Sequence, residues 1–166
     1  AEREKLNIMF ATTAGGVRRN ALSDFVDIRR SGIIAMKLDE GEAIADVALC
    51  TDADDVLLST ASGQCIRFPV SEVRVFKGRD SSGVRGIKLE KDDKLISMAI
   101  IRHIDATSEE RVAYLRLANA VRRGEEAEAE SDDEEKVGSI ELSQQRYAEM
   151  GAAEQFILTL TDLGYG

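Results

Sequence analysis

The side chains best suited to chemistry in this sequence are arginines and lysines in two glycine-containing stretches. The stronger stretch, 79–89, reads RDSSGVRGIKL, and a similar one at 29–38 reads RRSGIIAMKL. Cationic groups on a surface bind phosphate by charge, and this binding needs no geometry for reading bases. The two stretches therefore predict a binding surface for a polyanion such as double-stranded DNA.

We expect nine basic side chains in loops and outer strands to contact DNA phosphates. They are Arg18, Arg19, Arg29 and Arg30 in a first group, and Arg67, Arg74, Lys77, Arg79 and Arg85 in a second. The residues alone leave open that these side chains only keep the protein soluble. Lys37 and Lys88 stand in predicted strands. For these two lysines, DNA contact and a structural role are equal alternatives.

No other residue set predicts catalysis or metal binding. Asp52, Asp54 and Asp55 are not followed by the glycine and glutamate of an EF-hand, so we interpret them as a turn. His103 is the only histidine and has no nucleophile beside it, which suggests a residue at a boundary. The glycines of 83–86 do not form a P-loop or a dinucleotide fingerprint. We expect no catalytic residue, no metal and no cofactor in this chain.

The elements that must position the basic residues form a repeat. Short strands are predicted at 8–13, 17–22, 33–38 and 43–50, and again at 56–60, 65–70 and 95–101. Equivalent positions are 48 residues apart in the first half and 51 in the second, because the second loop is longer. A third copy begins at Phe156. Four short strands per repeat of about 50 residues are typical of propeller-like blades. Two unrelated small β-domains are the alternative.

A helical insertion interrupts the repeats at 103–155. Thr107 and Glu110 have the spacing of a capping box, and Gly124 is placed to end the helix. We expect Val112, Leu115 and Ala118 to share its apolar face, with Tyr114, Leu117 and Val121 beside it. A second helix is predicted at 142–150, with Ser143 as its cap. Between the two helices, 125–136 is predicted to be disordered, because it is acidic and has no apolar residue larger than alanine.

The charge distribution keeps a nucleic acid partner open, although the formal net charge is −9. Residues 103–155 carry 14 acidic and 6 basic residues, so the rest of the chain is close to neutral. No apolar run approaches the ~18 residues of a membrane span. We expect a reducing compartment and two buried thiols, and a chain that is a fragment, since it begins without methionine. The acidic run could also compete with DNA for the basic surface.

Four stretches of this sequence resemble the C-terminal domain of the DNA gyrase A subunit. They read ATTAGGVRRNALSDF, LLSTASGQCIRFPVSEVRV, SSGVRGIKL and FILTLTDLGYG. The related subunit of topoisomerase IV is a weaker match. The resemblance implies an all-β fold, a β-pinwheel whose propeller-like blades have four antiparallel strands and exchange strands with their neighbours. It also implies a basic rim that wraps DNA and so supports ATP-dependent negative supercoiling.

On this resemblance, 1–53 is blade one, 54–102 is blade two, 103–155 is the insertion and 156–166 is the first strand of the next blade. The family's gyrase box, Gln-Arg-Arg-Gly-Gly-Lys-Gly, is absent, and only Arg29-Arg30-Ser31-Gly32 stands at the corresponding loop. The implied partners are double-stranded DNA, the remaining blades and the gyrase B subunit, with no membrane.

The resemblance also limits what this chain does by itself. Catalytic residues, ATP and Mg would belong to other parts of the parent topoisomerase, so the fragment alone is not expected to be an enzyme. The implied location is the bacterial cytoplasm, at the nucleoid. The main alternative is a propeller-type module that binds proteins and no nucleic acid. A third possibility, an enzyme with its site in a propeller channel, lacks a catalytic set.

Overall fold

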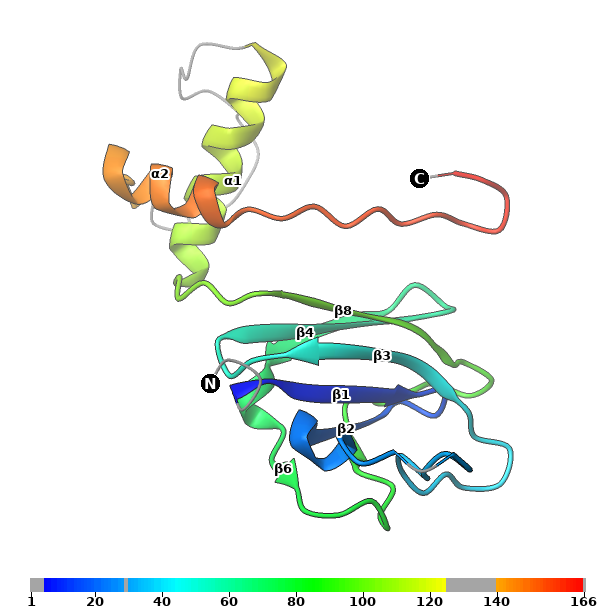
Figure 1. The fold of residues 1–166 in the computed structure, drawn as a ribbon. Coiled ribbons are helices and arrows are strands. Elements are labelled where there is room, and N and C mark those ends of the chain that lie inside the picture. Colours follow the sequence, from blue (N-terminus) through cyan, green and yellow to red (C-terminus); the bar gives the residue numbers. More distant parts are fainter. Residues whose placement is uncertain (1–4, 29, 125–139, 166) are drawn as a thin grey trace. The chain divides into compact units, whose positions relative to one another are not determined.

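The computed structural model describes residues 5–28, 30–124 and 140–165. The predicted disorder of 125–136 therefore lies outside the described residues. The chain divides into two units, Ala1–His103 and Ile104–Gly166. The first is built from strands and the second from helices (Figure 1). Among the described residues, no helix has both the length and the apolar character needed to cross a membrane.

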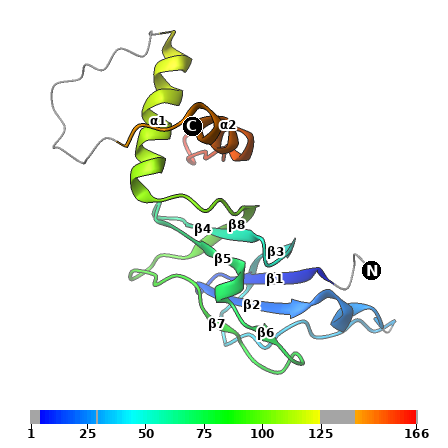
Figure 2. The same ribbon diagram turned by 90° about the vertical axis from the view of Figure 1, so that its left-hand side faces the viewer.

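Two sheets form the first unit, and their longer strands pair antiparallel (Figure 2). In the first sheet β1 lies between β2 and β3, and in the second β4 lies between β5 and β8. A 3₁₀ turn follows β2 at Leu22–Phe25, and another follows β5 at Val70–Glu72. The strand bounds are β1 Asn7–Thr12, β2 Gly16–Ala21, β3 Ile44–Cys50, β4 Asp54–Thr60, β5 Cys65–Pro69 and β8 Leu95–Arg102.

The two sheets repeat one local design, as the sequence predicts. Each hairpin turn has a glycine with positive φ, Gly15 at 82° and Gly63 at 87°, a conformation that glycine adopts without steric cost. The threonine before each turn, Thr12 or Thr60, accepts a hydrogen bond from a backbone amide through its hydroxyl. Both threonines also lie at a register shift in the ladder to the next strand. The repeat is therefore present in the backbone as well as in the sequence.

The third copy reproduces this turn without its strands. Gly164 has φ 80°, and the Thr161 hydroxyl accepts from the amide of Tyr165 at 3.1 Å. The first strand of the next blade is expected at 156–166, but the described part of this segment contains no strand, and Phe156 and Leu158 are largely exposed. A strand needs a paired neighbour, and none of the described residues pairs with this segment.

Two short strands of the second repeat complete the first sheet. They are β6 (Val75–Phe76) and β7 (Val84–Arg85), and both pair with β2, β6 in parallel and β7 antiparallel. The first sheet thus exchanges a segment with the neighbouring repeat (Figure 2). The predicted strand at 33–38, the equivalent segment of the first repeat, is not a strand in the structure. Among the described residues no strand pairs with this segment, and β5, the repeat equivalent of β2, pairs only with β4.

One apolar core lies between the two sheets and takes side chains from both repeats. Its largest fully buried members include Met9 of β1, Leu58 of β4 and Leu95 of β8. The expectation of two buried thiols is half wrong, because Cys50 is buried and Cys65 is exposed. Cys65 is the repeat equivalent of Val17, which is buried, and only the sheet of Val17 receives the exchanged strands.

The second unit is a pair of helices, α1 (Ser108–Arg123) and α2 (Gln144–Ala153). The capping box of Thr107 and Glu110 and the left-handed C-cap Gly124 are confirmed, and Ser143 caps α2. The predicted apolar face of α1 needs correction: Ala113, Tyr114 and Ala118 are buried, whereas Val112 and Leu115 are exposed. The Tyr114 ring contacts the Tyr147 ring of α2 at an interplanar angle of 39°, with the centroids 5.2 Å apart. The buried side of α1 is therefore the side that carries Tyr114.

Candidate nucleic-acid interface

Four cations gather on the segment that the second repeat gives to the first sheet. Arg74 and Lys77 flank β6, Arg79 lies in the loop 77–83, and Arg85 ends β7. We call these four side chains the basic edge. The segment 74–85 contains a single carboxylate, Asp80. Because β6 and β7 pair with β2, these cations lie at the outer side of the first sheet, although they belong to the second repeat.

The basic edge presents most of its charge to solvent. Arg74, Lys77 and Arg85 are exposed, and Arg79 is half-buried. The guanidinium of Arg74 lies 3.8 Å from the centroid of the Phe76 ring, a cation–π contact that restrains the side chain and leaves its charge intact. Arg79 donates to the backbone carbonyl of Asp24 at 3.3 Å. None of the four forms an ion pair with a described residue.

Two of the predicted DNA contacts are buried instead. Arg18 has no exposed surface, and Arg19 is 5% exposed. Burial lowers the pKa of Arg18 below its ordinary value, while the nearby Asp80 carboxylate acts in the opposite direction. Arginine stays protonated in proteins, so this buried group is a cation. We leave both residues out of the proposed interface, since phosphate contact needs an accessible charge.

The equivalent arginines of the two repeats are held by carboxylates. Arg19 pairs with the exposed Asp52. Its repeat equivalent Arg67 donates from Nε to buried Asp55 at 2.7 Å, and the other oxygen of Asp55 lies 2.8 Å from His103 Nδ1. These pairs account for Asp52 and Asp55, and Asp54 accepts hydrogen bonds from the amide and hydroxyl of Thr51 within the turn. Among the residues that the structure describes, no cluster of three or more His, Cys, Asp or Glu is arranged for a metal.

The other predicted residues divide by position. Arg29 lies outside the described residues, and Arg30 is exposed in a turn. Lys37 and Lys88 are both exposed, and the backbone amide of Lys37 donates to the Ser81 carbonyl at 3.4 Å. Lys37 therefore lies beside the loop of the basic edge, a neighbourhood that no sequence signal indicates.

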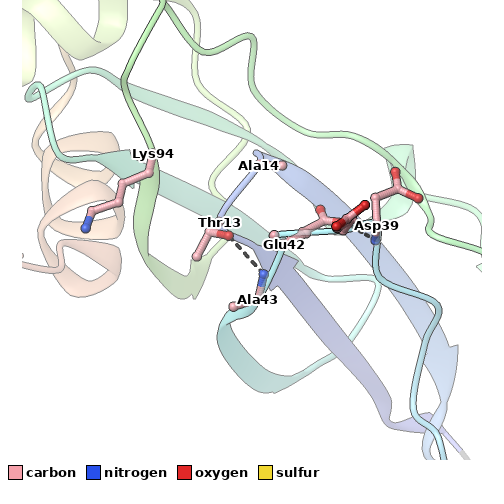
Figure 3. A pocket seen from close by; sticks show the side chains of 8 residues that line it. Thr13, Ala14, Asp39, Glu42, Ala43 and Lys94 are labelled. Carbon is pink, nitrogen blue, oxygen red and sulfur yellow. Dashed lines mark hydrogen bonds between the residues drawn. The ribbon is translucent and has the colours of Figure 1, made fainter.

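A surface hollow of about 500 Å³ lies in the first unit (Figure 3). Its lining includes Asp39, Glu40 and Glu42, with Lys94 across from them. Its polar groups hold turns together: Glu42 accepts from the amide of Asp39, and the hydroxyl of Thr13 accepts from the amide of Ala43. Three carboxylates repel phosphate, so this hollow is not part of a nucleic-acid interface.

Paired blade-like sheets that exchange strands, with a cationic outer edge, define this unit as a β-pinwheel or propeller-type repeat domain. The family model described as "DNA gyrase C-terminal domain, beta-propeller" matches residues 6–51 and 54–102. The chain therefore belongs to the DNA gyrase C-terminal domain family.

Individual proteins agree with this assignment. The DNA gyrase A subunit of Granulibacter bethesdensis is 51% identical over 98% of this chain and 18% of its own length. The same subunit of Rickettsia bellii is 45% identical over 99% of the chain and 18% of its own length. The chain thus spans less than a fifth of these relatives. A solved DNA gyrase A C-terminal domain superposes with a TM-score of 0.53 over 59% of this chain and 32% of its own, at 21% identity. This last likeness concerns the fold.

Proposed function

We propose that this chain binds double-stranded DNA without sequence preference, as part of the DNA-wrapping domain of a gyrase A subunit. The observation that supports this most is the basic edge, where strand exchange gathers Arg74, Lys77, Arg79 and Arg85. Phosphate contacts of this kind position a duplex and carry no sequence information. Bending 20–30 bp of DNA costs roughly 1–6 kcal/mol, so several blades would have to share the work. Arg30 is exposed in a turn and is a further candidate contact, as is Arg67, whose guanidinium also pairs with Asp55.

The proposed role in the whole protein is to present wrapped DNA for strand passage, and thereby to support ATP-dependent negative supercoiling. The chain spans 18% of its gyrase relatives. The catalytic residues, the ATP and Mg sites and the contacts with gyrase B would lie in the other parts. The corresponding place is the bacterial cytoplasm.

The test is the salt dependence of binding to two 30-bp duplexes of unrelated sequence, followed by fluorescence anisotropy. If about four phosphates are neutralised, log affinity should fall with log salt with a slope of about −3.6, and equally for both duplexes. Lys77→Ala should reduce the magnitude of the slope by about 0.9. The matched control is Lys91→Ala, which removes an exposed lysine from the turn before β8.

Two results would contradict the proposal. One is a strong preference for one duplex, and the other is an equal effect of Lys77→Ala and Lys91→Ala. Absence of any binding at 50 mM salt would favour the alternative of a protein-binding module.

A further inference from the structure

Arg18 is the largest fully buried side chain among the described residues. A buried guanidinium is costly unless its N–H groups are hydrogen-bonded. The pKa of Arg18 is lowered by that burial. A buried guanidinium therefore needs hydrogen-bond acceptors around it. The residues that supply these acceptors are the ones that Arg18 holds in place.

The acceptors of Arg18 lie at both ends of one short loop. Its Nη1 donates to the Ser81 hydroxyl at 2.8 Å and to the Ser81 carbonyl. Its Nη2 donates to the carbonyl of Gly78, and its Nε donates to Asn20 Oδ1 at 2.8 Å. One side chain of β2 thus joins the two ends of the segment 78–81.

Asn20 completes the arrangement from the same face of β2. Its amide nitrogen donates to the carbonyls of Phe76 and Gly78, at 3.0 and 2.9 Å. The Arg18 guanidinium also lies 4.9 Å from the centroid of the Phe76 ring. Residues 77–83 contribute no buried side chain of their own. The two polar residues of β2 therefore hold this loop, together with the contact of Arg79 with the Asp24 carbonyl and that of the Lys37 amide with Ser81.

The loop held in this way carries Lys77 and Arg79 of the basic edge. The second repeat cannot form these hydrogen bonds, since the positions equivalent to Arg18 and Asn20 are Ile66 and Phe68. We propose that Arg18 is a positioning residue for DNA binding, which fixes the loop 77–83 and its cations without itself touching phosphate. This inference rests on the proposed function.

The first arm of the test measures amide hydrogen exchange of the 166-residue chain without DNA. Arg18→Met keeps the bulk of the side chain and removes its donors. We expect faster exchange in 77–83 in this variant and unchanged exchange in β1 and β4. Lys77→Ala is the control, because it removes an exposed cation of the same loop and leaves the arrangement of β2 and the contact of Arg79 with Asp24 in place. Unchanged exchange in 77–83 would overturn the proposal, whether or not DNA binds.

The second arm is a double-mutant cycle of DNA affinity at 0.1 M salt. In the native background Arg79→Ala should weaken binding roughly eightfold, which is the value of one phosphate contact. In the Arg18→Met background the same change should cost less than about twofold, because the cation is no longer held in place. Equal costs in both backgrounds would overturn the proposal. Absence of DNA binding by the native chain would instead refute the proposed function and leave the exchange result to decide on the loop.

Ser81→Ala is a second variant that tests the proposal if Arg18→Met destabilises the whole sheet. This change removes one exposed acceptor and leaves the core intact. It should raise hydrogen exchange in 77–83 by a smaller factor than Arg18→Met does. It should also reduce the loss of DNA affinity caused by Arg79→Ala, again by less than Arg18→Met does. If it changes neither quantity, the proposal is wrong.

Discussion

Gly86 lies directly against Val17, so close that a Cβ atom on Gly86 would come within 2.7 Å of Val17 Cγ1. It would also come within 2.8 Å of Leu58 Cδ1, across the core. The amide of Gly86 donates to the carbonyl of Gly15 at 2.9 Å. The glycine of the SSGVRGIKL stretch thus allows the exchanged segment to pack against β2.

Gly86→Ala should destabilise the first unit by about 1–3 kcal/mol, the usual cost of overpacking a core. Urea unfolding would measure the loss, and hydrogen exchange should increase at β7. Gly41→Ala is the control, because Gly41 has φ 79° and open space around its Cα. That change should cost about 1 kcal/mol through backbone strain alone, with no effect at β7. Equal exchange at β7 in the two variants would contradict the packing argument.

Arg67→Met should destabilise the chain by about 2–3 kcal/mol, because it leaves the buried Asp55 carboxylate without its cation. Adding Asp55→Asn to this variant should restore part of the loss, since a neutral amide needs no ion pair. The measurement is urea unfolding of the single and double variants. A double variant less stable than the single one would show that the Asp55 charge is not what Arg67 compensates.

Asp93 should make stability depend on pH below about pH 4. Hydrogen bonds from Ser62 above all, at 2.6 Å from its hydroxyl and 3.0 Å from its amide, lower the pKa of Asp93 to about 2. A lowered pKa stabilises the folded state above the unfolded pKa, and this contribution is lost as pH falls toward about 2. Thermal melts should show native chain and Asp93→Asn converging over that range. A constant difference between them would contradict the assignment.

The two cysteines should differ sharply in reactivity. Burial raises the pKa of the Cys50 thiol to about 11, so little thiolate is present at pH 8, and Cys50 is only 2% exposed. Cys65 is exposed. A thiol-specific reagent at pH 8 should label one cysteine rapidly, and Cys65→Ser should abolish the rapid phase. Rapid labelling that survives in Cys65→Ser would mean that the first sheet opens readily at Cys50.

The sequence predicted well wherever the signal is local. The turns of Gly15 and Gly63 and the caps Thr107 and Gly124 are confirmed, because each depends on residues within four positions. The face of α1 was predicted less well. The apolar periodicity along α1 predicts that Val112 and Leu115 are buried. Instead, the side of α1 that contacts Tyr147 on the other helix is buried.

By itself, the sequence determined the repeat and its hairpins, because alternating apolar residues and turn glycines act over a few positions. The family followed from the resemblance of four stretches of the sequence. Only the tertiary structure decided which cations reach the surface. Arg18 looks like an exposed strand residue until Gly78 and Ser81, some sixty positions later, supply acceptors for it. Pairing between two-residue strands and β2 has no local signal, since its stability comes from the packed sheet that receives them.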